Sequence, residues 1–434
     1  MDAYDVVVVG GRVAGSTLAS LLGAGGLKVL LLERATFPAD TLSTHVIYGD
    51  SFGIWERVGA WPAIERFGNT KLWGISWIRD GKPDIRGRFW TVRGHDYSLC
   101  IRRILLDDVL FATAAEAPGV TAIEGARVTE LLRDGPRVSG VRFETHDASG
   151  GTTTSTATAR LVAGCDGRRS FVARAVGARQ YVTESPINFA FYTYVEGVGP
   201  GPDPEPMFEI WESEHNGGTP MLAECDAGIS MAIVYLPQPG FDAFRTQKDE
   251  NFWAAMDRDP RLGPRLRAGA QVAPIRGGGD FVNFIREPVG EGWALVGDAG
   301  QHKDPIFGQG IGDAARTAET LADCLLEAES SGSDWASALS RFRVMRDLDL
   351  VPNFRWMIQR RPTDLTEGAF DAIMDTLGSD PRQAERFINV FSHAVSGSEF
   401  FGRVNASQLL GADPAAFDTR RLQPGGGSGE GVRR

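Results

Sequence analysis

The sequence has little cysteine, little lysine and no long apolar run. Only 4 of its 434 residues are cysteines, and no two of them are spaced as C-x-x-C. This spacing argues against a disulfide framework and against a metal site, and it favours a reducing cytoplasm. No stretch approaches the ~18 apolar residues of a membrane span. The apolar run at 6–9 ends at once in two glycines, so we expect neither a signal peptide nor a membrane span.

The chain also lacks an excess of positive charge. It carries 45 Lys and Arg against 56 Asp and Glu, for a net charge of −11. A nucleic acid, which is a polyanion, is therefore not an expected partner. The apolar fraction of 42% excludes wholesale disorder, and the length corresponds to about two or three domain-sized units.

Glycine, by contrast, is abundant, with 53 residues. Runs 6–9 and 29–32 predict buried strands, and residues from 14 to about 22 predict a helix, which together make a right-handed βαβ unit. The turn between them reads G-G-R-V-A-G. Gly10 permits the tight turn and Gly15 permits close packing of helix on strand. The helix N-terminus at Arg12, Val13 and Ala14 offers free N–H groups to a pyrophosphate.

Glu33 and Arg34 end this unit and complete the candidate cofactor site. They follow the second strand about 20 residues after the turn, where dinucleotide-binding folds place an acidic residue on the ribose hydroxyls. Arg12 departs from the fingerprint because it stands at the middle glycine, and its side chain could supply positive charge to the phosphates instead. A tight turn with no ligand is the alternative explanation of this motif alone.

A second motif follows the last predicted strand, at 293–296. There Gly297-Asp298-Ala299-Gly300 is followed by the run D-P-I-F-G-Q-G at 304–310, and then by a predicted helix from about 312 to 329. Together with Gly164-Cys165-Asp166-Gly167, these motifs resemble the class A flavoprotein monooxygenases, which have the fold of para-hydroxybenzoate hydroxylase. The superfamily also includes geranylgeranyl reductases and flavin-dependent halogenases. The resemblance covers roughly residues 4–335.

The resemblance implies roles in FAD binding for several residues. Asp298 matches the aspartate that binds the ribityl chain, and Arg103 matches the arginine of an R-x-x-L-D helix that contacts the cofactor, although a solvated charge is the alternative for Arg103. Asp166 and Gly167 match a motif near the pyrophosphate that is implicated in NAD(P)H use. The loop whose N–H groups face the flavin edge comprises Pro305, Gly308, Gln309 and Gly310, and the helix after it would stabilise the negative charge of reduced flavin.

Three residues are candidates for catalysis: His45, His302 and Pro305. Both histidines lie where relatives line the flavin, so either is expected to donate to the flavin or to act as acid or base. A hydrogen-bonded structural histidine is the alternative for each. Lys303, beside them, either holds substrate or cofactor charge or is simply solvated.

The fold expected is α/β, with a Rossmann-type FAD-binding domain built on a parallel sheet. We assign it residues 1–70, 98–178 and 278–336. An antiparallel-sheet substrate domain at 71–97 and 179–277 interrupts it, because aromatic and β-branched residues alternate there. C-terminal helices are expected over 337–422, followed by a disordered glycine-rich tail at 423–434.

Aromatic residues of the substrate domain are candidates for a pocket wall: Trp73, Trp77, Trp90, Phe189, Phe191, Tyr192, Tyr194 and Trp211. Alternation puts Phe189 and Phe191 on one face of their strand and the two tyrosines on the other. Such a wall implies a sizeable, mostly apolar or aromatic small-molecule substrate.

The activity implied is a monooxygenase that uses FAD, NAD(P)H and O₂ to hydroxylate or epoxidise this substrate, in bacterial natural-product metabolism, as a monomer or homodimer. A reductase or desaturase of the geranylgeranyl-reductase type is the alternative. A halogenase is less favoured, because no two tryptophans are spaced as in the W-x-W-x-I-P motif of halogenases and Lys71 is only a distant match for the halogenase lysine.

Overall fold

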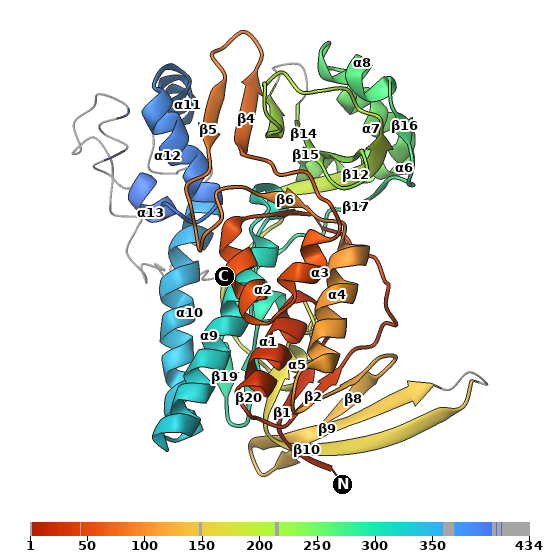
Figure 1. Cartoon of the computed structure of the whole chain (residues 1–434), viewed down its shortest axis with the longest axis vertical. Helices are drawn as coiled ribbons and strands as arrows, with labels where there is room; N and C mark the ends of the chain where they lie inside the picture. The colour runs from red at the N-terminus through yellow and green to blue at the C-terminus, as the bar shows by residue number, and fades with distance from the viewer. Residues whose placement is uncertain are drawn as a thin grey trace, which may run out of the picture.

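A parallel sheet lies at the centre of the chain (Figure 1). In the computed structural model, which describes residues 2–43, 45–146, 150–212, 217–358, 369–401, 405 and 409, it has the order β20-β10-β1-β2-β7. These strands are β1 (Asp2–Val9), β2 (Val29–Leu32), β7 (Val120–Ile123), β10 (Thr152–Gly164) and β20 (Trp293–Leu295), all paired in parallel. The buried run at 6–9 forms its middle strand, as expected of a strand covered on both faces.

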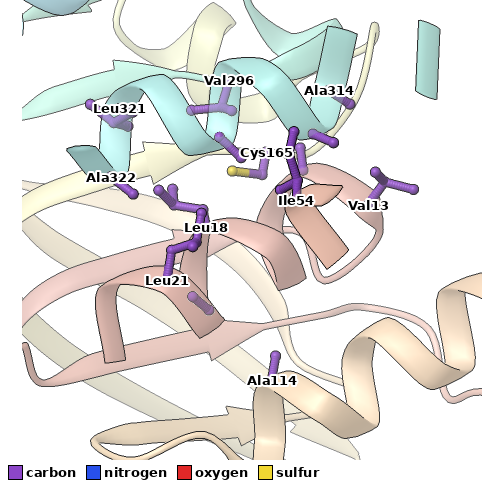
Figure 2. Packing of buried hydrophobic residues seen from close by; sticks show 14 of the residues in the cluster. Val13, Leu18, Leu21, Ile54, Ala114, Cys165, Val296, Ala314, Leu321 and Ala322 are labelled. Atoms are coloured by element: carbon purple, nitrogen blue, oxygen red, sulfur yellow. The ribbon is translucent and has the colours of Figure 1, made fainter. Parts of the chain in front are cut away.

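Three helices cover one face of this sheet, namely α1 (Val13–Ala24), α4 (Arg103–Glu116) and α9 (Gly310–Ser331). Figure 2 shows Leu18 and Leu21 of α1 on the side that faces Leu321 and Ala322 of α9. Alternate residues of β1 therefore point into two different cores, with Val8 on this side of the sheet. This packing fixes the positions of the N-termini of α1 and α9 relative to the sheet.

The other face is covered by α5 (Phe171–Ala175) and by a long hairpin, β8 (Arg127–Asp134) and β9 (Arg137–His146), which with β10 extends beyond the helices in Figure 1. The sequence did not predict this hairpin or the length of its partner β10, which runs over 13 residues. Residues 152–159 are mostly polar, and they form a strand by pairing with β9 rather than by burial.

The second sheet carries strands in the order β16-β12-β15-β14-β13-β4-β5, with β17 also paired to β12. Their bounds are β4 (Gly74–Arg79), β5 (Ile85–Arg88), β12 (Asn188–Glu196), β13 (Phe208–Glu212), β14 (Thr219–Glu224), β15 (Ile229–Pro237), β16 (Ala270–Gln271) and β17 (Arg276–Gly278). One pair corrects the expectation of an antiparallel sheet, because β4 and β13 are parallel. They lie far apart in the chain and are not joined by a hairpin, so nothing local requires opposite directions.

The two faces of β12 pack as the alternation predicts. Phe189 and Phe191 pack against α6 (Phe241–Thr246), α7 (Lys248–Met256) and α8 (Leu262–Arg267). Tyr192 and Tyr194 lie in the opposite core with α11 (Ala369–Ser379) and α12 (Pro381–Phe391). Helix α10 (Trp335–Ile358) packs along α9, so the C-terminal region is helical where it is described. The predicted disordered tail at 423–434 lies outside the described residues.

Short elements complete the described chain. They are β3 (Val46–Ile47), β6 (Leu99–Cys100), β11 (Gln180–Glu184), β18 (Asn283–Arg286), β19 (Val289–Gly290), β21 (Gln301–His302), α2 (Gly49–Arg57), α3 (Trp61–Glu65), α13 (Gly397–Phe400), and the 3₁₀ turns η1 (Gln238–Gly240), η2 (Gly297–Ala299) and η3 (Pro305–Phe307). Among the residues described, no helix is long and apolar enough to cross a bilayer.

Gly15 is the point where α1 touches the turn that precedes it. A Cβ there would lie 1.7 Å from the Gly10 carbonyl oxygen, whereas a Cβ at Gly199, on a loop of the second domain, would meet nothing within 4 Å. Overpacking costs about 1–3 kcal/mol. We expect Gly15→Ala to lower the midpoint of thermal unfolding by several degrees and Gly199→Ala to leave it unchanged, as measured by circular dichroism. Equal midpoints for the two variants would contradict the packing described.

Candidate functional site

A cavity of about 660 Å³ opens where the strands of the parallel sheet end. The chain reaches its wall directly after β1, β2 and β10, at Gly10, Glu33 and Cys165. Crevices at the carboxyl ends of parallel strands are where such sheets bind ligands. The predicted site residues that line it are Gly10, Arg12, Val13, Ala14, Glu33, Arg34, Arg103, Asp166, Gly167, Asp298, His302, Pro305 and Gly310.

The N-terminus of α1 forms one end of the cavity. No side chain caps this helix, and its first residues, Val13 and Ala14, line the cavity, so N–H groups are open there. Gly10 has φ +102°, and a Cβ on it would lie 2.5 Å from the Cys165 carbonyl oxygen. Only glycine therefore fits this turn, and the space in front of it fits a pyrophosphate.

Glu33 is buried at the end of β2 and holds the same turn. Its carboxylate accepts hydrogen bonds from the Gly11 N–H at 2.6 Å and from the Ala35 N–H at 2.8 Å. It also lines the cavity, beside Arg34. Because each carboxylate oxygen has a second lone pair, these contacts leave Glu33 able to accept from ribose hydroxyls as well.

Arg12 and Arg103 share one buried partner, Asp107. Arg103 donates to both Asp107 oxygens, at 2.8 Å and 2.9 Å, and the Arg12 guanidinium bonds to the same carboxylate and to the Ala39 carbonyl oxygen at 3.2 Å. Arg103 is 9% exposed, so the alternative of a solvated charge is wrong. The departure of Arg12 from the glycine fingerprint is accommodated by Asp107, which lies on α4.

The Asp166–Gly167 motif lies in the turn between β10 and α5. One Asp166 oxygen accepts from the Phe171 and Val172 N–H groups, at 2.6 Å and 3.2 Å, while the other is buried without a partner among the described residues. Burial raises the pKa of this carboxyl. Arg168, which follows the motif, lines the cavity over the Phe281 ring. Asp166, Gly167 and Arg168 thus all belong to the cavity wall.

Asp298 projects from the turn after β20. Burial raises the pKa of its carboxyl, and none of the hydrogen bonds among the described residues reaches that carboxylate. Asp298 is half-buried at the cavity wall, so a ligand in the cavity can supply hydrogen-bond donors to its carboxylate. Ribityl hydroxyls of FAD would supply them at this position.

The loop at 304–310 is fastened from three directions. The Asp304 carboxylate accepts from the Asn188 side-chain amide at 3.0 Å, and the hydroxyls of Tyr235 and Tyr48 donate to the carbonyl oxygens of Pro305 and Phe307, at 3.2 Å and 3.0 Å. These contacts take up carbonyl and side-chain groups of the loop. Helix α9 starts directly after it with no side-chain cap, so its first N–H groups are open toward the cavity at Gly310.

Lys303 is buried beside this loop, and the alternative of a solvated lysine is wrong. Its ammonium lies 2.9 Å from an Asp313 oxygen and donates to the Gln309 amide oxygen at 2.7 Å. The Gln309 amide in turn donates to the carbonyl oxygens of Val390 and Phe391, where α12 ends. Gln309 thus supports the site from behind the cavity wall, as Gly308 and Gly15 do.

The two candidate histidines lie in different surroundings. His302 lines the cavity, with Nδ1 2.8 Å from the Val282 carbonyl oxygen and its ring stacked on Phe284. His45 does not line it: the ring is fully buried, with Nε2 2.9 Å from the Tyr194 hydroxyl. Burial, together with the charge of Arg103, lowers the pKa of His45 to about 3, so this ring is neutral. The catalytic roles of both histidines stay predictions.

The wall at the other end of the cavity comes from residues that the sequence analysis did not select, namely Ala190, Ile233, Tyr235 and Phe281. None of the aromatic residues proposed for a pocket wall lines the cavity. Alternation along β15 places Ile233 and Tyr235 on one face, which was a usable signal. Arg127, at the start of β8, also lines the cavity, but it was not selected because that strand was not predicted.

Together these features fit FAD. They provide two uncapped helix N-termini, a glycine turn that admits no Cβ, and the half-buried carboxylate of Asp298, which accepts no hydrogen bond from the described residues, all on one cavity. The described residues contain no group of three or more His, Cys, Asp or Glu side chains placed to hold a metal ion.

Comparisons with known proteins agree with this assignment. Residues 3–255 match the family described as FAD binding domain. The chain is 23% identical over 378 residues to the 1H-pyrrole-2-carbonyl-(peptidyl-carrier protein) chlorinase of Pseudomonas fluorescens, covering 79% of this chain and 80% of that protein. It is 28% identical over 377 residues to digeranylgeranylglycerophospholipid reductase 2 of Methanothermobacter thermautotrophicus, covering 86% and 90%.

Among solved structures, PqsL of Pseudomonas aeruginosa, a probable FAD-dependent monooxygenase, matches with a TM-score of 0.67 at 18% identity, covering 89% of this chain and 99% of that one. Several other curated relatives are halogenases. These matches confirm the superfamily resemblance and the α/β fold.

We expect Asp298→Ala to weaken FAD binding about tenfold or more, because a hydrogen bond to a charged group contributes about 1.5–3 kcal/mol. Quenching of flavin fluorescence on titration of the apoprotein measures the dissociation constant. The matched control is Asp323→Ala, an exposed carboxylate that pairs with Arg57 away from the cavity. Equal dissociation constants for the two variants would refute the ribityl assignment.

His45 predicts a pH dependence of stability. Its pKa in the folded chain, about 3, lies below its ordinary value of 6.5, so the unfolded chain takes up the proton first. Stability from this group is present above pH 6.5 and is lost as the pH falls toward 3, by up to about 1.4 kcal/mol per pH unit.

The test replaces His45 with Asn, which tolerates the observed φ of +64° and does not titrate. Urea unfolding between pH 7 and pH 4 should show a shallower loss of stability for His45→Asn than for the wild type. Exposed His146→Asn should keep the wild-type slope. Parallel slopes for all three proteins would show that His45 is not buried as described.

Proposed function

The chain belongs to the FAD binding domain family, and from this premise we propose that it is a monooxygenase. It is an FAD-dependent oxidoreductase by family. The reaction we propose uses NAD(P)H and O₂ to hydroxylate or epoxidise a sizeable, mostly apolar or aromatic small molecule.

The observation that carries this proposal is the continuity of the cavity. One space joins the open N-termini of α1 and α9 to a wall formed by Ala190, Ile233 and Phe281. FAD, when bound, supplies hydride acceptance and oxygen activation. An apolar wall at the α9 end holds a substrate there and excludes water, which protects the reaction from side reactions.

The residues of the chain bind, orient and move protons. The α1 N-terminus holds the pyrophosphate, Asp298 the ribityl chain, and the α9 N-terminus the negative charge of the reduced ring. The Val282 carbonyl accepts from Nδ1 of His302, so Nε2 is the ring nitrogen that remains for exchanging a proton with a ligand. His302 is thus the candidate base at this end of the cavity.

Halogenation and reduction are the competing activities, since halogenases and a reductase are among the relatives. Lys71, the nearest match for a halogenase lysine, holds its ammonium 4.4 Å from the centre of the Tyr97 ring and does not line the cavity. The chain also has no pair of tryptophans two residues apart. These two observations favour oxygenation over halogenation.

The test measures NADH and NADPH oxidation by the FAD-loaded protein against a panel of aromatic and polyketide-like compounds, under ¹⁸O₂. Substrate-stimulated oxidation with ¹⁸O in the product is the expected outcome. Reactions without substrate measure the background consumption of NAD(P)H. Anaerobic turnover to a reduced product would replace the proposal with a reductase, and a halide-dependent halogenated product would replace it with a halogenase.

A further inference from the structure

Lys303 is the one lysine of this chain that is buried, with an exposed fraction of 6%. It lines the cavity beside His302 and Pro305, at the end where α9 begins. An ammonium has three N–H groups. The contacts among the described residues use two of them, one to Asp313 and one to Gln309.

The position of Lys303 is not one that favours the stability of the fold. Burying an ammonium is costly, and a cation at a helix N-terminus is placed against the positive end of the helix dipole. Asp313 also does not need Lys303 as a partner, because Arg316 lies 2.6 Å from its other oxygen. Burial alone would raise the pKa of the Asp313 carboxyl, but Lys303 and Arg316 hold the pKa below its usual range.

The charges around this group come from several elements. Arg316 also pairs with Asp50 of α2 and, at 3.2 Å, with Asp349 of α10. Its positive charge is therefore shared among carboxylates that lie away from the cavity wall. Among the charged groups of this cluster, Lys303 and Asp313 are the two that line the cavity.

We propose that Lys303 is a redox-tuning residue whose third N–H stabilises the negative charge that the FAD ring acquires on reduction. This inference rests on the proposed function, because it requires FAD in the cavity. Hydride transfer from NAD(P)H adds two electrons and one proton to the ring and gives NAD(P)⁺, so the reduced ring carries one negative charge until it takes up a second proton. Lys303 favours that state over the neutral oxidised ring, and Asp313 opposes it.

The test measures the equilibrium constant for flavin reduction, by spectral titration of the FAD-loaded protein against a reference dye. Lys303→Met should lower this constant about tenfold or more, the effect of losing a hydrogen bond from a charged donor. Lys303→Arg keeps the charge and should stay within about threefold of the wild type. Lys71→Met, which removes an ammonium outside the cavity, is the control and should change nothing.

A second variant separates tuning from a merely structural ion pair. Asp313→Asn removes the opposing carboxylate and keeps the ammonium, so the equilibrium constant should rise. If Lys303 and Asp313 formed only a structural ion pair, Lys303→Met and Asp313→Asn would change the equilibrium constant for flavin reduction in the same direction. The proposal requires changes in opposite directions.

Four outcomes would overturn the inference. They are an unchanged constant in Lys303→Met, a folded Lys303→Met chain that fails to bind oxidised FAD, an unchanged constant in Asp313→Asn, and a lowered one in Asp313→Asn. The last two decide the matter if Lys303→Met does not fold. A wild-type chain that binds no FAD would instead refute the proposed function.

Discussion

The structure depends on holding one loop rigid while leaving the N–H groups after it open. Residues 304–310 are fixed through their carbonyl and side-chain groups by Asn188 and Tyr235 of the second sheet and by Tyr48 of the first domain. The Gln309 side chain also links the loop to the end of α12 through two hydrogen bonds. Because each region contributes a contact, the N-terminus of α9 is positioned by the whole fold. It has no side-chain cap, so its first N–H groups stay open for the cofactor that we propose there.

Charge is handled locally in this acidic chain. A net charge of −11 repels a polyanionic cofactor at long range, yet the cavity wall gathers arginines. Asp107 holds Arg12 and Arg103 together, which keeps two cations at one place without leaving either buried and unpaired. We therefore propose that the phosphates are attracted by helix N-termini and paired guanidinium groups over a few ångströms, where screening by salt is weak.

Sequence patterns predicted those parts of the fold whose residues have few alternatives. Gly10 and Gly15 meet backbone atoms that no Cβ could approach, so the first turn and its site were predictable. The β8–β9 hairpin carries such a signal that was not used, because Val141 and Phe143 alternate after Asp134-Gly135, whereas β10 is polar over 152–159 and gives none. The parallel pairing of β4 with β13 was equally hidden, since alternation reports which face a residue occupies and not the direction of its neighbour.

The same reasoning explains why the cofactor end of the cavity was predictable and the substrate end was not. Binding a pyrophosphate requires glycine turns and helix N-termini in a fixed order, and these leave motifs in the sequence. A substrate wall requires only shape, and the one that we propose is formed by Ala190, Ile233 and Phe281, which come from separate segments and belong to residue types that any core contains. Such a wall can change without disturbing the cofactor site. Relatives at 23% and 28% identity can therefore share the FAD binding domain while one is named a chlorinase and another a reductase.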